Sequence, residues 1–416
     1  MADGLAKRSP TRDIRTICLP CTEEKYAGIV KDARRFRLWL AECFAAHPEL
    51  FPADFAKGFT MADRRTAKKL GIMVRRIELT DGQRFSVRPS FVMPYMTART
   101  EDVEKPLFLR KFSVPFWALA YIFGRDAMFW FRQECRLGHF SLVGTTIRQA
   151  EVPEHLIADE HHQTCDGDKV FLATTVGSGC CLGVAMAKTA STDDLKAAYQ
   201  VFHDEARDVN PAYLPKTVNA DGWKSTQAAW LLLFPTIVVL RCFLHAWLKI
   251  RDRAKNLKET FHELSRRVWH AYHAGTKRSM AQRLRHLLTW ASQNVSGVVL
   301  ETVQDLCAKK KFWLKAYDHP QVHRTSNMLD RVMRSMHRYF FDGQHLHGSM
   351  ATNEKHVRGW ALLWNFAPWH PAITKANEGW RSPAERLNKH RYHDNWLQNL
   401  LLSASLGGYR SAPQKA

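Results

Sequence analysis

The feature that most constrains the fold is a regular alternation of strand-like and helix-like segments between His155 and Arg241. Runs of apolar and β-branched residues bounded by turn residues indicate strands, and apolar residues at three- and four-residue spacing indicate helices. The second and third strands flank a Gly-Ser-Gly turn at 177–179 and form a predicted hairpin. We predict strands at 155–159, 169–176, 181–188, 216–221 and 236–241, and helices at 192–207 and 223–233.

The order of these elements is three antiparallel strands, a helix, a strand, a helix and a strand. This is the order of an RNase H-like sheet, in which the first and fourth strands lie side by side. Asp159 ends the predicted first strand and Asp221 ends the fourth. Two or three converging carboxylates are what a two-Mg²⁺ phosphodiester chemistry requires, because Mg²⁺ takes oxygen ligands. The alternative is that both aspartates only end strands beside polar loops.

The composition narrows the choice of partner. The 416 residues include 61 Lys and Arg against 40 Asp and Glu, which gives a formal net charge of +21. We therefore expect a polyanion as partner, with double-stranded DNA ahead of an anionic membrane. The longest apolar stretch, 228–240, is shorter than a membrane span and contains Pro235, so no transmembrane helix is expected. No secretory signal is recognised and the nine cysteines are unevenly spaced, which favours a cytoplasmic, nucleoid-associated protein.

Four short motifs, in this order, resemble those of DDE-type bacterial insertion-sequence transposases over about 86–401. They are Leu-Ile-Ala-Asp-Glu at 156–160, Val-Asn-Ala-Asp-Gly-Trp at 218–223, Cys-Phe-Leu-His at 242–245 and Arg-Thr-Ser-Asn-Met-Leu-Asp-Arg at 324–331. The chain is most similar to the Mutator-like group, which has a helical insertion in the RNase H-like domain. The resemblance implies cleavage at the ends of a DNA element, 3′-hydroxyl strand transfer into target DNA, two Mg²⁺ or Mn²⁺ ions, and a homodimer or larger assembly on DNA.

The third acid of the site is predicted to be Asp330, which stands where that group has glutamate. An aspartate is one methylene shorter, and it can still bind the metal if its helix lies closer to the sheet. Glu354 is the alternative third acid. A different interpretation is that Asn327 and Asp330 cap the start of a helix, where the helix dipole favours an acid.

Five further residues are predicted to support the site. The resemblance implies that Cys242 and His245 assist the active site, whereas the residue types alone also fit a buried thiol beside a histidine that hydrogen-bonds a carbonyl. Glu160, His161 and His162, next to Asp159, are predicted helpers near the metal ions. They fit an exposed loop equally well.

A candidate zinc site lies near the N-terminus. Cys18 and Cys21 are followed by Cys43 and His47, a spacing that resembles that of a small zinc finger. A structural Zn²⁺ would stabilise a module with little core of its own. The alternative is simple burial, because Cys43 shares a helical face with Phe36.

These observations divide the chain into six predicted segments and define the fold class: an α/β catalytic domain of RNase H-like fold with an all-α insertion, plus a mainly helical N-terminal DNA-binding region. The segments are an accessory module at 1–100, a helical segment with a candidate helix-turn-helix at 101–150, the first part of the core at 151–245, a helical insertion at 246–322, the completing helices at 323–405 and a flexible tail at 406–416. Within the accessory module, 74–78 and 84–87 flank an Asp-Gly turn at 81–82 and form a predicted hairpin.

DNA contacts are expected from basic segments with interleaved aromatic residues. The candidates are 105–111, 251–258, 277–285, 309–315 and 331–338. Trp313 is predicted either to stack on an unpaired base or to anchor the insertion. The function expected from these features is that of a DNA transposase. A transposase-derived DNA-binding regulator without catalysis, or an RNase H-like nuclease or resolvase without strand transfer, stays open.

Overall fold

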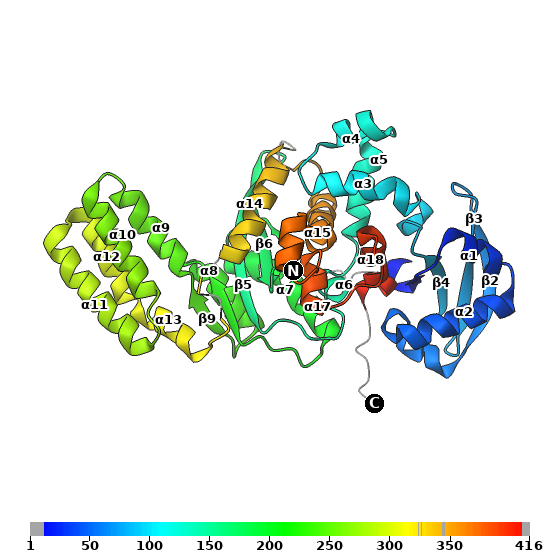
Figure 1. The fold of residues 1–416 in the computed structure, drawn as a ribbon, viewed down its shortest axis with the longest axis horizontal. Helices are drawn as coiled ribbons and strands as arrows, with labels where there is room; N and C mark the ends of the chain where they lie inside the picture. Colours follow the sequence, from blue (N-terminus) through cyan, green and yellow to red (C-terminus); the bar gives the residue numbers. More distant parts are fainter. Residues whose placement is uncertain (1–11, 323, 326, 343–345, 410–416) are drawn as a thin grey trace, which may run out of the picture.

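The computed structural model describes residues 12–409, except 323, 326 and 343–345. The chain is a mixed α/β protein whose described strands form two sheets. Figure 1 shows three lobes in a row: an N-terminal α/β lobe, a central α/β lobe and a helical lobe that is coloured green to yellow. None of the helices in the described ranges is long and apolar enough to cross a membrane.

The N-terminal lobe is built on a sheet of four strands in the order β1-β4-β3-β2. They are β1 (Thr16–Leu19), β2 (Phe59–Ala67), β3 (Ile72–Leu79) and β4 (Arg84–Pro89). Strand β1 is parallel to β4, and the other neighbours are antiparallel. Helices α1 (Glu23–Ile29) and α2 (Ala33–Ala46) accompany the sheet. The prediction of a mainly helical N-terminal region is wrong for this lobe, which is built on a four-stranded sheet. The sequence did not reveal β1, which is short, or β2, which is too polar to show the alternation expected of a strand.

Four helices connect this lobe to the centre: α3 (Thr100–Arg110), α4 (Phe116–Phe123), α5 (Ala127–Leu137) and α6 (Leu142–Thr146). All of α6 is buried, and its amides at Leu142 and Val143 donate to the Glu205 carboxylate at 2.7 and 3.2 Å. This helix therefore cannot enter a DNA groove. Helix α4 exposes Trp117 and Tyr121 at 69% and 87% but carries no charge, so it does not fit a phosphate backbone either. The predicted helix-turn-helix is not supported.

The central lobe contains a five-stranded sheet in the order β7-β6-β5-β8-β9. Its strands are β5 (His155–Cys165), β6 (Asp168–Gly177), β7 (Cys180–Ala187), β8 (Thr217–Ala220) and β9 (Val238–Arg241). Strands β5, β6 and β7 are antiparallel, whereas β8 and β9 run parallel to β5. The five predicted strands are present in the predicted order. Strand β5 continues past Asp159 because the polar residues up to Cys165 pair with β6.

Helices cover both faces of this sheet. Helices α7 (Thr192–Val209) and α8 (Lys224–Leu233) pack in one core with Leu156 and Ala158 of β5. On the other face, α14 (Asn327–Asp342) and α15 (Met350–Phe366) share a core with Ile157 of β5. The alternation of side chains along β5 therefore sends odd-numbered residues toward α14 and even-numbered residues toward α7 and α8.

The helical lobe follows β9 and has its own core. Its helices are α9 (Phe243–Ala254), α10 (Glu259–Tyr272), α11 (Lys277–Asn294), α12 (Gly297–Ala308) and α13 (Lys310–Leu314). Trp313 is only 5% exposed, and its ring nitrogen donates to the carbonyl of Leu306 at 3.0 Å. Its ring also lies 5.4 Å from that of Phe243. Trp313 therefore anchors the lobe, and base stacking by this residue is not supported.

The chain ends on the central lobe with α16 (Pro371–Ala376), α17 (Pro383–Asn388) and α18 (Trp396–Ser403). The prediction of a flexible tail from residue 406 is wrong for Leu406–Gly408, which is buried. Gly407 and Gly408 adopt φ of 68° and 77°, and the carbonyl of Gly407 accepts the Ser141 amide at 2.9 Å. These left-handed glycines allow the tight turn that docks this segment beside α6. Residues 410–416 lie outside the described residues.

Candidate catalytic site

The pairing of β5 with β8 fixes the level of the two predicted aspartates. Ile157 pairs with Asn219 in a parallel register. Asp159 and Asp221 each follow this pair by two residues, so the two aspartates leave the paired region at the same level of the sheet. Asp159 is an odd-numbered residue of β5 and therefore faces α14.

Asp330 lies in the first turn of α14, which packs against β5. Burial, together with the negative charges of Asp221 and Asp330, raises the pKa of Asp159 to about 6, against the opposing effects of His245 and the Glu160 amide. Like charges act this way across short distances. Asp221 and Asp330 therefore lie close enough to Asp159 to influence its ionisation.

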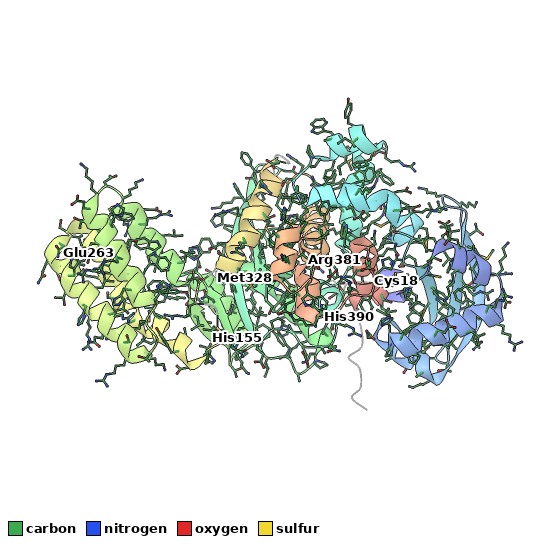
Figure 2. The ribbon with its side chains drawn as sticks, in the orientation of Figure 1. Cys18, His155, Glu263, Met328, Arg381 and His390 are labelled. Carbon is green, nitrogen blue, oxygen red and sulfur yellow. The ribbon has the colours of Figure 1, made fainter. Side chains whose placement is uncertain are left out.

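Backbone contacts hold the acids and their elements in place. The Asp159 carboxylate accepts the Glu160 amide at 2.9 Å, and the Asp221 carboxylate accepts the Trp223 amide at 2.7 Å. The start of α14 is held at the β6–β7 turn, where the Gly179 amide lies 2.8 Å from the Met328 sulfur. Figure 2 shows Met328 at the lower end of α14, on the same side of the central lobe as His155 at the start of β5.

Cys242 and His245 lie beside this site. The Cys242 amide donates to the carbonyl of Ala220 at 2.9 Å, which places Cys242 next to Asp221 across the sheet. A hydrogen bond with Cys242 raises the pKa of His245 to about 9, and the charges of Asp159 and Asp221 raise this pKa as well. His245 is therefore an imidazolium at neutral pH, and it provides a positive charge beside the acids.

Glu160 does not lie beside the carboxylate of Asp159. It is buried on the opposite face of the sheet, where it accepts the Tyr199 hydroxyl at 2.7 Å and the Thr226 hydroxyl at 2.9 Å. Burial raises the pKa of Glu160 to about 7. The prediction that Glu160 assists metal ions at the site is not supported, because neighbours along a strand point to opposite faces.

Glu354 also lies away from the three acids. It follows Asn353, whose side-chain amide donates to the Cys165 sulfur at 3.2 Å. Cys165 is at the far end of β5, six residues from Asp159, which is about 20 Å along a strand. The nearest charge effect of Glu354 is on Arg358, not on Asp159. The geometry thus favours Asp330 over Glu354 as the third acid.

A pair of histidines extends the site along β5: His161, which was predicted as a helper near the metal ions, and His337, which was missed in the sequence. The rings of His161 and His337 are 5.6 Å apart, between β5 and α14. Burial lowers the pKa of His161 to about 4, with help from His337 and His162, so it is neutral at physiological pH. The sequence signal for this pair was the odd-numbered position of His161, two residues after Asp159.

The predicted basic segments differ in their exposure. Arg331, Arg334 and Arg338 are exposed on α14, at a spacing that places them on one face of the helix that also carries Asp330. In contrast, Lys111 is half-buried, and its ammonium group donates to the carbonyls of Ala367 and Pro368 at 2.6 and 2.9 Å. Lys111, at the end of the segment 105–111, is therefore not available to a phosphate.

The three acids fit divalent cations by their donor chemistry. All three are carboxylates, which Mg²⁺ and Mn²⁺ prefer, and the repulsion that raises the pKa of Asp159 is what a cation between them would relieve. In the described ranges no group of three or more His, Cys, Asp or Glu side chains is already close enough to hold a metal ion. Metal binding would therefore draw the three side chains closer together.

The predicted zinc ligands serve other contacts in this conformation. The Cys18 amide donates to the Ser405 hydroxyl at 3.0 Å, and the thiol is buried. Cys43 lies on the buried face of α2, where burial raises its pKa to about 12, and burial raises the pKa of Cys21 to about 11. The His47 ring packs at 5.2 Å against that of Tyr392. Simple burial accounts for these residues.

Neither family models nor curated proteins match this sequence. The site itself therefore carries the functional argument. It combines three acids from β5, the end of β8 and α14 with a protonated histidine and an exposed row of arginines. This arrangement can hold divalent cations close to a polyanion.

Proposed function

We propose that this chain is a DNA transposase with an RNase H-like catalytic domain that cleaves the ends of a DNA element and joins them to target DNA. The observation that carries the proposal is the parallel register of Ile157 with Asn219, which sets Asp159 and Asp221 at one level of the sheet. The effect of Asp330 on the pKa of Asp159 adds the third acid that such chemistry uses.

The architecture supports the proposal. Three antiparallel strands are followed by two parallel strands on the β5 side, with helices on both faces, and this is the arrangement expected of an RNase H-like sheet. The helical lobe lies between β9 and α14 in the sequence, so it separates the second acid from the third. That position matches the helical insertion of the transposase group that the motifs resemble.

Asp159, Asp221 and Asp330 would hold two Mg²⁺ or Mn²⁺ ions. When bound, these cations supply the charge that stabilises the attacking and leaving oxygens of a phosphodiester. The carboxylates must be ionised to bind, and the raised pKa of Asp159 makes this step sensitive to pH near 6. His245 balances the charge of the acids through its imidazolium group.

The surface beside the acids suits a duplex. Arg331, Arg334 and Arg338 present positive charge along α14 without burying it, so they can contact successive phosphates of a DNA strand that reaches the site. Because a transposase must process two ends together, we expect a homodimer or larger assembly on DNA.

A strand-transfer assay tests the proposal. Purified protein is incubated with Mg²⁺ or Mn²⁺, labelled duplexes taken from the DNA on both sides of the gene, and a supercoiled target plasmid. We expect joined products, which fall at least about 100-fold in Asp159→Asn and Asp221→Asn, because losing a direct ligand exceeds the usual effect of losing its hydrogen-bond partner. Asp168→Asn, an exposed acid at the β5–β6 turn, is the matched control and keeps full activity.

The other outcomes each contradict the proposal. Cleavage without joined products would indicate a nuclease or resolvase. Binding of the duplexes by the unmodified protein without any cleavage would indicate a DNA-binding regulator. Products that persist undiminished in Asp159→Asn would remove this aspartate from the reaction.

A further inference from the structure

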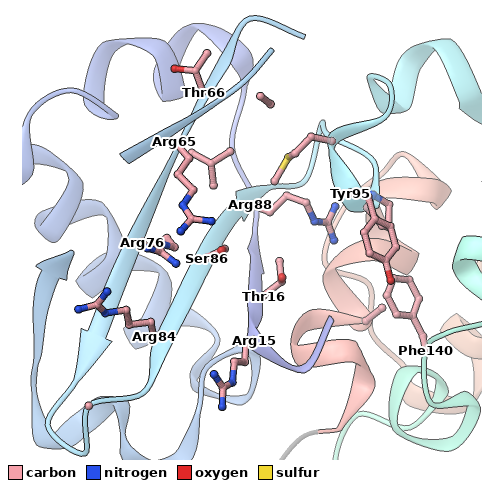
Figure 3. Close-up of a pocket in the computed structure, with 16 residues that line it drawn as sticks. Arg15, Thr16, Arg65, Thr66, Arg76, Arg84, Ser86, Arg88, Tyr95 and Phe140 are labelled. Carbon is pink, nitrogen blue, oxygen red and sulfur yellow. The ribbon is translucent and has the colours of Figure 1, made fainter. Parts of the chain in front are cut away.

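A groove of about 740 Å³ lies on the sheet of the N-terminal lobe, in a different lobe from the candidate catalytic site. Its residues come from all four strands and the turns beside them, from the turn before α3, and from Phe140 and Ala404 of the adjoining central lobe (Figure 3). Five of them are arginines: Arg15, Arg65, Arg76, Arg84 and Arg88. The described lining includes no aspartate or glutamate. The groove is therefore strongly positive, although no single basic run of the sequence marks it.

Strand register explains why the arginines gather on one face. Ser86 of β4 pairs with Thr16 of β1 on one side and with Arg76 of β3 on the other. Paired residues share a face, and so do residues two apart along a strand. Arg84 and Arg88 therefore lie on the face of Ser86, and Figure 3 shows these side chains on one side of the strands.

The opposite face of the sheet is apolar and buried. Ile17 and Val87, which pair with each other, are fully buried. The Tyr26 hydroxyl of α1 donates to the carbonyl of Val87 at 3.5 Å, which holds α1 over that face. The sheet is thus packed on one face and charged on the other. A solvent-facing sheet surface with an excess of positive charge indicates an anionic partner.

Two carboxylates hold three of the guanidinium groups in place. Asp63 accepts from Arg65 at 3.3 Å and from Arg76 at 2.5 Å, and Glu78 pairs with Arg84. These pairs fix the side chains above the sheet without cancelling the charge of the five arginines. Such ordering reduces the entropy lost when the arginines bind an anion.

We infer that this arginine face binds the phosphate backbone of double-stranded DNA. The planar guanidinium fork matches phosphate oxygens, and the hydroxyls of Thr16 and Ser86 between the arginines are further donors to phosphate. Arg15, Arg65 and Arg84 are exposed and can reach phosphates, whereas Arg88 is buried and donates to the carbonyl of Val92. The inference rests on the proposed function for the kind of nucleic acid, and it places DNA binding and DNA cleavage on separate sheets.

The rim of the groove is held in an unusual backbone conformation. Tyr95 and Met96, both lining residues, are consecutive non-glycine residues with φ of 59° and 54°. Each such residue costs about 1–2 kcal/mol, and strain of this kind persists mainly where a site requires it. The result is that the Tyr95 ring is 41% exposed at the edge of the groove, where it can contact the sugar–phosphate backbone.

The test compares two charge-matched double variants of the full-length protein. Arg65→Ala with Arg84→Ala removes two exposed arginines from the groove, whose side chains are 63% and 57% exposed. Arg35→Ala with Arg266→Ala removes two arginines outside it, both 70% exposed, each of which also faces one carboxylate. Both double variants are combined with Asp159→Asn, and binding to the labelled flanking duplexes is measured in EDTA. Cleavage therefore cannot influence the result.

We expect the groove variant to raise the Kd about 10- to 100-fold and to reduce the salt dependence of log Kd by about two, the loss of two phosphate contacts. The control should change the Kd less than about threefold. An equal loss in both variants, no loss in the groove variant, or better competition by single-stranded than by duplex DNA would overturn the inference. If the unmodified protein gives no strand transfer while the groove variant still loses DNA binding, the proposed function is wrong and the assignment of the DNA-binding surface is kept. If strand transfer occurs while the groove variant binds DNA normally, only the assignment of this surface is wrong.

Discussion

Two acids of the central region, the buried Glu134 on α5 and the half-buried Asp159 on β5, differ in how their charge is balanced. Glu134 accepts from Arg110 at 3.0 Å, lies 3.3 Å from the His356 ring nitrogen, and accepts the hydroxyl of Tyr339. Burial alone would raise its pKa, but these partners together lower the pKa of Glu134 to about 2. Burial and neighbouring acids instead raise the pKa of Asp159 to about 6.

The difference separates a structural acid from a candidate catalytic one. Glu134 stands in a network that satisfies its charge within the protein and joins α3, α5, α14 and α15. Asp159 has neighbouring acids that oppose its ionisation, and His245 and the Glu160 amide compensate for them only in part. A fold retains an acid whose charge is incompletely balanced where an external charge completes it. The comparison predicts opposite responses to neutralising the two acids.

Glu134→Gln tests the structural side of the comparison and should have the largest effect. The amide cannot balance Arg110, which is buried, and breaking a buried ion pair costs about 3–5 kcal/mol. The folded-state pKa of Glu134 is lowered, so its stabilisation is present above its ordinary pKa near 4.5 and is lost as the pH falls toward about 2. The melting temperature should therefore drop strongly at neutral pH, and the difference from wild type should narrow in acid.

Glu385→Gln is a suitable control for Glu134→Gln, because Glu385 is also buried but caps a short helix. We expect a smaller loss from it, about 1 kcal/mol. Equal melting curves for wild type and Glu134→Gln at neutral pH would show that the network does not stabilise the fold, and the comparison would lose its structural half.

Asp159→Asn tests the candidate catalytic acid of this comparison and should stabilise the metal-free protein. The folded-state pKa of Asp159 is raised from its ordinary value near 3.8 to about 6. Between these two pH values Asp159 is ionised in the unfolded chain but still protonated in the folded protein, so the free energy of unfolding falls as the pH rises. Asparagine removes this penalty, and we expect a gain of about 1–3 kcal/mol above pH ~6 that disappears below pH ~4. Thermal melting in EDTA at both pH values measures it.

Asp168→Asn serves as the control for this effect, because Asp168 is exposed at the β5–β6 turn and should change stability by less than about 0.5 kcal/mol. An Asp159→Asn protein that melts below wild type in EDTA at alkaline pH would mean that this carboxylate is stabilising. The two acids would then no longer differ.

The central sheet could be predicted from the sequence because its strands are apolar and bounded by turns. The strand at 216–221 and the acids at 159 and 221 were visible in that pattern. The N-terminal sheet was only partly visible, as one hairpin, because β1 has four residues and β2 carries polar residues on both faces. Its arginines became a surface only through strand pairing, which sequence spacing does not reveal.

The remaining wrong predictions about the site concern residues whose side chains lie on a different face of a strand or helix from the one expected. Glu160 is adjacent to Asp159 in sequence but lies across the sheet from it. Lys111 and Trp313 are residue types that often contact nucleic acids, yet Trp313 is buried and the Lys111 ammonium group is bound to backbone carbonyls. The surroundings of such residues depend on distant segments, such as the carbonyl of Ala367 that accepts from Lys111 at 2.6 Å. Local patterns cannot supply that information.

Mg²⁺ should also distinguish Asp159 from Glu134, through a smaller change in the stability of the folded protein. If the three acids hold the cation with a Kd of about 1 mM, about 10 mM Mg²⁺ stabilises the folded protein by about 1.4 kcal/mol. The shift should be absent in Asp159→Asn and unchanged in Glu134→Gln. It should also weaken below pH ~6, because Asp159 binds its proton there. Melting curves with and without Mg²⁺ measure the shift, and an equal shift in all three proteins would place the bound cation elsewhere.

The smallest effect is expected from Glu354→Gln, a variant that tests whether Asp330 or Glu354 is the third acid of the site. Glu354 lies near the Cys165 end of β5, and it does not contribute to the raised pKa of Asp159, whereas Asp330 does. Its replacement should therefore change stability by about 0.5 kcal/mol or less and leave strand transfer and the Mg²⁺ shift intact. Asp330→Asn, the matched variant, should abolish both. Loss of both in Glu354→Gln but not in Asp330→Asn would assign the third ligand to α15. Helix α14 would then only cover the sheet.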